Sequence, residues 1–200
     1  MKKLLILYPA EFKSKSKFDR KVAKITSQMT DYGVVYLKDH SGFVAQHFEQ
    51  KAALDKLETD DLDNAEITHA IVFADDEVFQ DEISTLRSRG VSLRLVRIQI
   101  TRVINIKKET QYAHLKSNAQ YEYIGRGSYW GNPYSMFAEG DSRGEVIRKF
   151  KYDFDNDKFA KKQRSEVFKL SGKRLGCFCK PDACHGDVLA DFLNAWDDGA

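Results

Sequence analysis

The chain has 200 residues, of which 42% are hydrophobic and 31% are charged, and this composition is typical of a soluble globular protein of one or two small domains. Its apolar runs fall well short of the about 18 residues that a transmembrane helix needs, which excludes a membrane-spanning protein, and the first residues are too weakly apolar for a signal peptide. With 32 basic and 30 acidic side chains the net charge is +2, so the overall charge points to no class of partner.

The first hundred residues alternate between short β-rich runs and amphipathic helical patterns. Such alternation is typical of a parallel sheet covered by helices, so we predict a Rossmann-like α/β domain over residues 1–100. In chain order, the expected elements are strand 4–8, helix 17–29, strand 33–37, helix 41–57 capped by Ser41, an acidic loop over 58–66, strand 70–74, helix 77–89 and an alternating β run over 91–106.

The pattern changes from about Thr101, where the strand–helix alternation stops and aromatic residues and glycines become dense. We predict a second, α+β domain over residues 101–200 that carries a Cys/His metal site. Its expected elements are a short strand over 121–124, a helical region over 142–170 broken near 155–157, a short strand over 173–178 and a final amphipathic helix over 187–196.

The three cysteines of the chain fall within eight residues near the C-terminus, next to a histidine. A disulfide framework would spread an even number of cysteines along the chain, so this usage indicates a reducing compartment and a metal or reactive-thiol site. Three thiolates and an imidazole form the ligand set of a tetrahedral zinc site. We therefore predict zinc as the cofactor, with Cys177, Cys179, Cys184 and His185 as its ligands.

Other interpretations of this cluster stay open. The cysteines could be small buried hydrophobes beside a solvated histidine, or they could hold an iron–sulfur cluster. A third interpretation makes Cys179 or Cys184 a nucleophile with His185 as its base. Asp187 would orient His185 in the metal interpretation, or would be an ordinary charge in the first turn of a helix.

A glycine-rich aromatic loop over 124–134 has the parts of a nucleotide pocket. Its glycines let backbone amides approach a ligand, Arg126 offers a planar fork for a phosphate, and Trp130 and Asn132 offer a stacking face and a base-reading amide. The alternative is a tight structural loop in which Trp130 is a core anchor and Asn-Pro is a turn. The predicted ligand-binding residues are Arg126, Ser128, Trp130, Asn132 and Arg143.

The stretch from Arg143 to Lys180 is basic, with 12 lysines and arginines against five acids. Interleaved aromatic residues such as Phe150 and Phe159 make it a candidate track for a polyanion backbone. The alternative is a solvated helix face over an apolar stripe.

Several motifs of the second half occur in the same order in a domain family of unknown function found in tailed bacteriophages and bacteria, and residues 102–194 resemble that family. The resemblance implies that the glycine loop, Arg143 and the cysteine cluster belong to one site, and it names no reaction. The motifs are Ile124-Gly-Arg126-x-Ser128-x-Trp130-Gly-Asn-Pro133, Ser142-Arg143-x-Glu145-Val-Ile147 and Gly176-Cys177-x-Cys179-x-Pro181-x-x-Cys184-His185-Gly-Asp187-Val-Leu189.

The first half resembles the Rossmann-like folds of nucleoside deoxyribosyltransferases and of the lysine-decarboxylase-like group. Asp76 and Glu82 have a spacing similar to the aspartate–glutamate pair of the deoxyribosyltransferases. Glu77, however, stands near the place of the glycine that normally follows the aspartate, and this departure argues against a glycosyl-transfer nucleophile here.

Together these features predict a cytoplasmic protein, in the host cytoplasm if it is phage-encoded, that binds or processes a nucleotide, a nucleoside or a nucleic-acid base. Zinc would be structural and would support the glycine, aromatic and arginine pocket. The sequence leaves open whether the protein is a hydrolase or transferase acting on nucleotides or nucleosides. The alternative function is a non-enzymatic nucleic-acid-binding module or an inhibitor of a host protein.

Overall fold

The computed structural model of the chain forms two compact units. Unit 1 comprises Met1–Gln99 and Ala195–Ala200, and unit 2 comprises Ile100–Asn194. The chain therefore leaves unit 1 once, builds unit 2 and returns to unit 1 with its last residues. The structure describes residues 1–49, 56–58, 62, 66–112, 114–115, 117–136 and 140–199.

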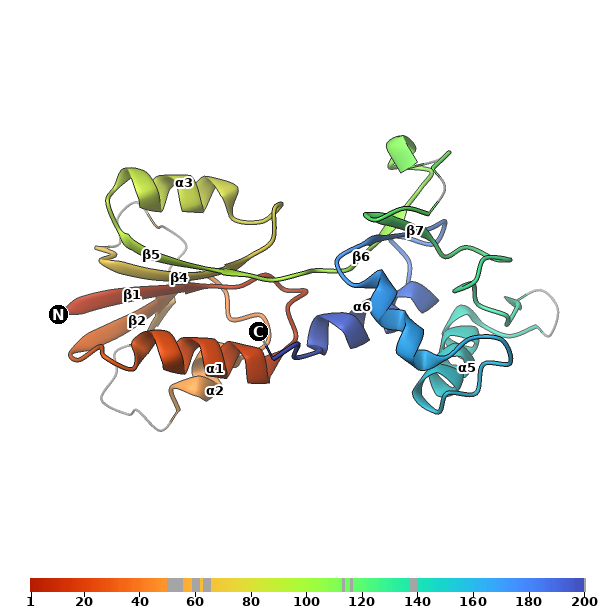
Figure 1. Ribbon diagram of the computed structural model, residues 1–200, viewed down its shortest axis with the longest axis horizontal. Helices are drawn as coiled ribbons and strands as arrows, with labels where there is room; N and C mark the ends of the chain where they lie inside the picture. The colour runs from red at the N-terminus through yellow and green to blue at the C-terminus, as the bar shows by residue number, and fades with distance from the viewer. Residues whose placement is uncertain are drawn as a thin grey trace. The chain divides into compact units, whose positions relative to one another are not determined.

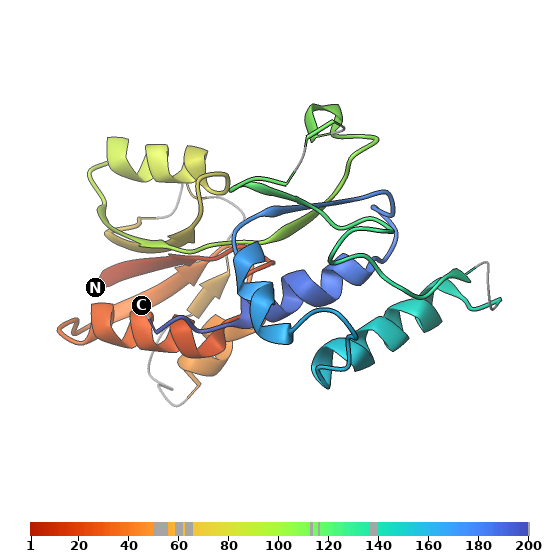
Figure 2. The same ribbon diagram turned by 45° about the vertical axis from the view of Figure 1, so that its right-hand side comes forward.

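Unit 1 is built on a sheet with the strand order β3-β2-β1-β4-β5, and every pairing among these strands is parallel. Helices cover both faces, with α3 on one side and α1 and α2 on the other (Figures 1 and 2). This architecture confirms the predicted Rossmann-like α/β fold. The elements are β1 (Lys2–Leu7), α1 (Lys15–Thr26), β2 (Tyr32–Tyr36), α2 (Phe43–His47), β3 (Lys56–Glu58), β4 (His69–Ala74), α3 (Gln80–Ser88) and β5 (Ser92–Arg97).

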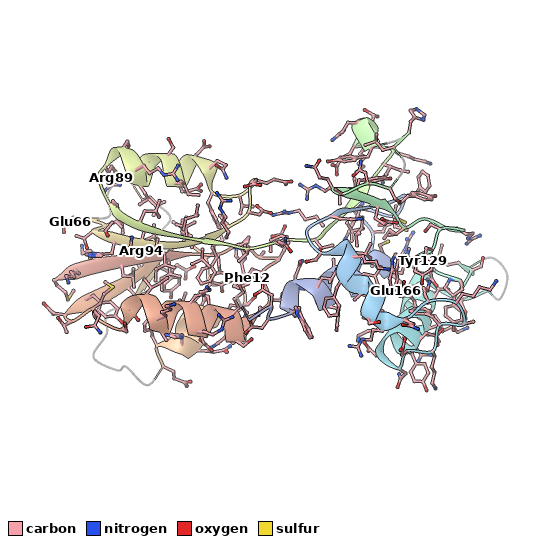
Figure 3. All side chains as sticks on the ribbon, in the orientation of Figure 1. Phe12, Glu66, Arg89, Arg94, Tyr129 and Glu166 are labelled. Carbon is pink, nitrogen blue, oxygen red and sulfur yellow. The ribbon has the colours of Figure 1, made fainter. Side chains whose placement is uncertain are left out.

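The core of unit 1 is built around the two central strands. Leu4–Leu7 in β1 and Ala70–Ala74 in β4 are buried, because both faces of the parallel sheet are covered. An aromatic layer packs between the sheet and α1, where Phe18 stacks on Phe73 with ring centroids 5.2 Å apart. Phe12, labelled in Figure 3, stacks on Phe73 as well, also at 5.2 Å.

The predicted helix over 41–57 is wrong in its length and its cap. The helix α2 ends at His47, and Lys56–Glu58 forms the edge strand β3, which pairs with β2 in the register Val34↔Lys56. The cap is supplied by Asp39, whose carboxylate accepts the N–H groups of Val44 (3.0 Å) and Ala45 (2.9 Å). The part of this helix over 50–55, and most of the predicted acidic loop over 58–66, lie outside the described residues.

The predicted β run over 91–106 is divided between the two units. Its first part is β5 of unit 1, and its second part is β6 (Arg102–Asn105) of unit 2. Thr101, between the two strands, is buried, and both of its backbone groups form hydrogen bonds with the side chain of Asn194. Its N–H donates to Asn194 Oδ1 (2.9 Å) and its C=O accepts from Asn194 Nδ2 (3.0 Å). These bonds hold the backbone at Thr101, where the chain has left the sheet of unit 1 and has not yet entered the sheet of unit 2.

Unit 2 contains a parallel sheet with the order β6-β8-β7, and α5 and α6 lie on one side of it (Figures 1 and 2). The break predicted near 155–157 is present, because α5 ends at Asp155 and Asp157 has φ +51°. The elements besides β6 are η1 (Thr110–Tyr112), β7 (Tyr121–Tyr123), α5 (Arg143–Asp155), η2 (Arg164–Leu170), β8 (Arg174–Cys177) and α6 (His185–Ala195). Among the described residues, no helix combines the length and apolarity required to span a bilayer.

Candidate functional site

The cysteines and the histidine meet where β8 ends and α6 begins. The Sγ atoms of Cys177 and Cys184 and a ring nitrogen of His185 all lie within 4.8 Å of one another, and the three residues are buried. Cys179, two residues beyond the strand, is half-buried, and its Sγ lies 3.6 Å from the Sγ of Cys177. The structure therefore brings all four predicted ligands together at one place in unit 2.

Two distances within this cluster match edges of a tetrahedral metal site, whereas Cys179 lies outside the group whose ligand atoms are all within 4.8 Å of one another. Zinc–sulfur bonds of about 2.3 Å and zinc–nitrogen bonds of about 2.0–2.1 Å place two sulfurs about 3.8 Å apart and a sulfur and a nitrogen about 3.6 Å apart. Cys177 Sγ and Cys179 Sγ are separated by 3.6 Å, and Cys184 Sγ and His185 Nδ1 are also separated by 3.6 Å. Each pair thus has the length of one edge of such a tetrahedron, and the cluster could hold a metal ion.

His185 is oriented by the backbone of the neighbouring strand connection. Its Nε2 lies 3.0 Å from the carbonyl oxygen of Ile124, so Nε2 carries the proton and Nδ1 turns its lone pair toward the thiols. Burial lowers the pKa of the imidazole, which favours the neutral form that a metal requires. The approach depends on Gly186, because a Cβ at this position would come within 2.4 Å of Ile124 Cδ1.

Of the two interpretations of Asp187, the structure favours the charge in the first turn of a helix, because Asp187 lies in the first turn of α6. Its carboxylate accepts the N–H of Cys184 at 2.9 Å and forms an ion pair with Lys180 at 2.6 Å, so it holds the backbone of the ligand loop and the start of α6. The group bonded to His185 Nε2 is the Ile124 carbonyl instead. Cys184 Sγ accepts the N–H of Gly186 at 3.4 Å, which stabilises negative charge on that sulfur.

The thiols share a proton network. The thiol of Cys184 donates toward Cys177, and this bond lowers the pKa of Cys177 and raises the pKa of Cys184. Burial raises the pKa of Cys179, while Arg143 donates a hydrogen bond to its sulfur and acts in the opposite direction.

A cavity of about 190 Å³ adjoins the cluster. Arg126 reaches it from the glycine loop and Arg143 from the first residue of α5. Arg143 forms an ion pair with Asp182 (3.2 Å) and donates to the carbonyl of Ala183 (3.4 Å), whereas Arg126 donates to Ser135 Oγ (3.2 Å). The wall also includes Cys177, Cys179, Cys184 and His185, and the cavity is otherwise lined mainly by Asn132, Tyr134, Val146, Ile147 and Phe178.

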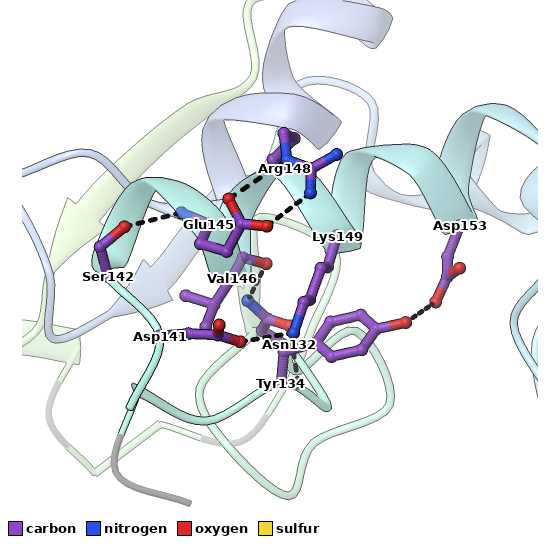
Figure 4. Close-up of polar contacts among 9 residues, drawn as sticks. All are labelled: Asn132, Tyr134, Asp141, Ser142, Glu145, Val146, Arg148, Lys149 and Asp153. Atoms are coloured by element: carbon purple, nitrogen blue, oxygen red, sulfur yellow. Dashed lines mark hydrogen bonds and ion pairs between the residues drawn. The ribbon is translucent and has the colours of Figure 1, made fainter. Parts of the chain in front are cut away.

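The glycine loop is fastened to α5 by Asn132. Its Nδ2 donates to the carbonyl of Val146 (3.1 Å) and its Oδ1 accepts the N–H of Tyr134 (3.0 Å), as Figure 4 shows. The start of α5 is fixed in the same region, because Ser142 Oγ accepts the N–H of Glu145 at 3.2 Å. Asn132 thus lies at the cavity with both ends of its amide bonded to the backbone.

Two other predicted residues serve the loop rather than the cavity. Trp130 is 3% exposed and belongs to the core of unit 2. Ser128 Oγ donates to the carbonyl of Gly125 at 2.7 Å and closes the turn. Neither is among the described residues that line the cavity. The side chain of Tyr129 points to Glu166 and donates a hydrogen bond to its carboxylate (Figure 3).

Residues that sequence reasoning did not single out complete the site. Phe178 is 48% exposed and lines the cavity, although alternation along a strand would point it away from its cysteine neighbours. Lys162 donates to the carbonyls of Tyr129 (2.9 Å) and Gly131 (3.3 Å), and its Nζ lies 4.3 Å from the ring centre of Phe159. Lys162 was visible in the sequence only as one basic residue among many.

The basic stretch is largely ion-paired, partly with acids that lie outside it in sequence. Lys149 pairs with Asp141, and Lys173 pairs with Glu122. This arrangement favours a solvated, ion-paired surface over a track for a polyanion. The other pairs of the stretch are Arg143–Asp182, Arg148–Glu145, Lys151–Asp155, Lys169–Glu166 and Lys180–Asp187.

A second cavity, of about 220 Å³, lies in unit 1 at the carboxyl ends of β1 and β2, where open α/β sheets bind ligands. Tyr8, Lys38, His40 and Phe79 contribute to its wall. Tyr8 donates its hydroxyl proton to Asp39, and Phe79 has φ +60°, an unusual conformation for a bulky residue.

Comparisons with known proteins agree with the division of the chain, because its two halves match two different families. Residues 1–104 match the family described as "Minimal SLOG domain", and residues 104–195 match "Domain of unknown function (DUF4326)". The chain is also 40% identical over 72 residues to an "Uncharacterized 12.4 kDa protein in nrdA-td intergenic region" of Enterobacteria phage T4. That alignment covers 36% of this chain and 65% of the phage protein, so the chain spans just under two thirds of that relative.

No solved structure matches the chain. The two family matches and the phage relative confirm the resemblance of the second half to a domain of unknown function found in phages and bacteria. SLOG domains are Rossmann-like and are associated with nucleotide-related functions.

Proposed function

This chain belongs to the minimal SLOG domain family, and from that membership and the site in unit 2 we propose that it binds a nucleotide or a nucleoside phosphate in the cavity beside the cysteine cluster. We propose further that the cluster holds zinc, with Cys177, Cys179, Cys184 and His185 as ligands. The observation that carries the proposal is the pair of guanidinium groups, Arg126 and Arg143, at a mainly apolar cavity next to a metal-binding set.

The chemistry of the cavity suits the two ends of a nucleotide. Guanidinium groups bind phosphate oxygens through paired N–H donors, and Arg126 and Arg143 both reach this cavity. Phe178 and Tyr134 offer flat faces for a base or a sugar. A volume of about 190 Å³ is below the roughly 300–1,000 Å³ of pockets that enclose drug-sized ligands. One part of the nucleotide would therefore enter the cavity, and the rest would lie against the exposed ring of Phe178.

Zinc in this proposal has a structural role. Four protein ligands complete a tetrahedral shell. The ion would tie the end of β8 to the start of α6, and through the loop between them it would fix the acceptors of Arg143, which are Asp182 and the carbonyl of Ala183. Loss of the metal would then displace a phosphate-binding arginine without touching it directly.

The test is calorimetric titration of the full-length, zinc-loaded chain with a set of nucleoside mono-, di- and triphosphates at fixed salt. Arg126→Ala and Arg143→Ala should each weaken binding by about tenfold or more, which is a loss of about 1.4 kcal/mol, with zinc content and circular dichroism unchanged. The matched control is Lys38→Met in the cavity of unit 1, which should bind as the parent does. If Lys38→Met abolishes binding and the arginine variants do not, the ligand sits in unit 1 and the proposed site is wrong. Absence of binding by all nucleotides in the set would refute the proposed function itself.

A further inference from the structure

The four thiol and imidazole groups of the cluster are not equivalent. We propose that Cys177, Cys184 and His185 suffice to hold the metal, and that Cys179 is a replaceable fourth ligand whose place can be taken by an oxygen of a phosphate-class anion bound in the cavity. This inference rests on the proposed zinc centre and deepens it, because it opens one coordination position to the ligand.

The inner three ligands are buried and held by their own backbone. Cys177 is 5% exposed, Cys184 1% and His185 6%, and their ligand atoms form the group within 4.8 Å. Cys177 belongs to β8 and faces Asn105 of β6 in the sheet register. Cys184 is held through its N–H by Asp187, and the His185 ring is held through Nε2 by the Ile124 carbonyl. The chain itself therefore holds these three positions, in addition to any bond to a cation.

Cys179 differs in each of these respects. It lies in the connection between β8 and α6, is only half-buried and falls outside the group within 4.8 Å, although its sulfur is 3.6 Å from Cys177 Sγ. Its carbonyl accepts the N–H of Asp182 in a turn, which holds the loop but not the side chain. A rotation about χ1 would move this sulfur off the metal without disturbing a strand or a helix.

Arg143 provides the second reason for exchange. Its guanidinium lines the same cavity as Cys179 and is held beside the ligand loop by its ion pair with Asp182 at 3.2 Å. A cation at this cavity stabilises a thiolate that is not bound to the metal. The same guanidinium, with Arg126, would bind the incoming anion.

With a metal bound, Cys177, Cys184 and His185 would hold the ion from the protein side. The fourth electron pair would come either from the thiolate of Cys179 or from an oxygen of the anion. Either donor would supply a complete pair, so the exchange would involve no oxidation or reduction, and a thiolate that is not bound to the metal would lie at the same cavity as Arg143.

The test uses the full-length chain loaded with cobalt(II) in place of zinc, because cobalt reports its ligands in the visible and near-ultraviolet spectrum and takes the same tetrahedral geometry. Cys179→Ser should keep one cobalt per chain, with an affinity lowered by about tenfold and a thiolate-to-cobalt band reduced by about one third, as three sulfur ligands become two. Cys177→Ser, the matched control, should lose the metal. Inorganic phosphate should shift the ligand-field bands of the parent, and it should do so at lower concentration in Cys179→Ser.

The outcomes separate the two proposals. If Cys179→Ser loses cobalt to the same extent as Cys177→Ser, Cys179 is an obligatory ligand and the inference is overturned. If the thiolate-to-cobalt band of Cys179→Ser is unchanged from the parent, Cys179 is not a ligand and the inference is overturned as well. Bands of the parent and of Cys179→Ser that do not respond to phosphate overturn it too. A parent chain that binds no cobalt or zinc refutes the metal centre of the proposed function instead. If Cys179→Ser does not fold, Cys179→Ala provides the same measurements.

Discussion

The buried amide of Asn194 gives the sharpest stability prediction. Asn194 is 5% exposed and satisfies both backbone groups of Thr101, accepting its N–H at 2.9 Å and donating to its C=O at 3.0 Å. In Asn194→Leu these two groups stay buried without a partner, which costs about 1–3 kcal/mol for each. The added apolar burial of leucine returns about 2 kcal/mol. We expect a net loss of about 2 kcal/mol, within a range of about 0–4 kcal/mol, in the free energy of unfolding of unit 2. A loss of about 2 kcal/mol corresponds to about 8–16 °C in the melting temperature of a domain of about 100 residues.

The assay is urea unfolding followed by the emission of Trp130, which is buried in unit 2, with Trp196→Phe as the common background. The control is Asn156→Leu, since the exposed amide of Asn156 donates to Tyr152 O at 2.8 Å and water can replace that bond. This control should change stability by less than about 0.5 kcal/mol. The reasoning is refuted if Asn194→Leu is as stable as the control.

Three further predictions concern the metal, a buried ion pair and acid. Removal of zinc by a chelator should lower the melting temperature of unit 2 and leave that of unit 1 unchanged, as seen by calorimetry with native mass spectrometry on the same sample; a single unchanged transition would contradict a structural ion. The side chain of Lys17 is 8% exposed and its Nζ lies 2.7 Å from Asp198 Oδ2. Asp198→Asn should therefore lower the free energy of unfolding by about 1–2 kcal/mol, because it leaves a buried ammonium without a charged partner; the loss is smaller than for a fully buried pair because the aspartate is partly solvated. Lys17→Met should be close to neutral in the same urea titration. Hydrogen bonds from Tyr129, Lys169 and the N–H of Gln163 hold the pKa of Glu166 at about 2, against an ordinary value of 4.5. The contribution of Glu166 to stability is therefore complete above about pH 4.5 and is lost as the pH falls to about 2. A carbon-13 titration of the carboxyl group should show the low pKa, and Glu166→Gln should flatten this part of the acid dependence of stability.

The parts of the fold that could be predicted are those with a local signal. Strands β1 and β4 were identified because a strand buried on both faces is apolar at nearly every position, and this is visible within six residues. Strand β3 was missed because Lys56–Glu58 has no such pattern and becomes a strand only by pairing with Val34–Tyr36, about 20 residues earlier in the chain. Pairing across that distance leaves no mark on local periodicity.

The candidate site shows the same division. The cysteines and His185 could be grouped in advance, because metal ligands of this type are rare and lay within nine residues. The role of Asn132 could not, since its acceptor is the Val146 carbonyl on α5, fourteen residues away. The sequence leaves Trp130 open between a core anchor and a stacking face, because the choice between core and cavity depends on packing that only the folded chain displays.

The chain leaves unit 1 before unit 2 and returns to it afterwards, and this has a consequence for protein engineering. The residues that open and close unit 2, Thr101 and Asn194, are joined by two hydrogen bonds, so the excised segment has its ends side by side, as an inserted domain does. A short loop that replaces 100–194 would leave the strands and helices of the Rossmann-like unit in one continuous chain. Segment 100–194 could in turn be grafted into a surface turn of an unrelated scaffold, and it would carry the cysteine cluster with it.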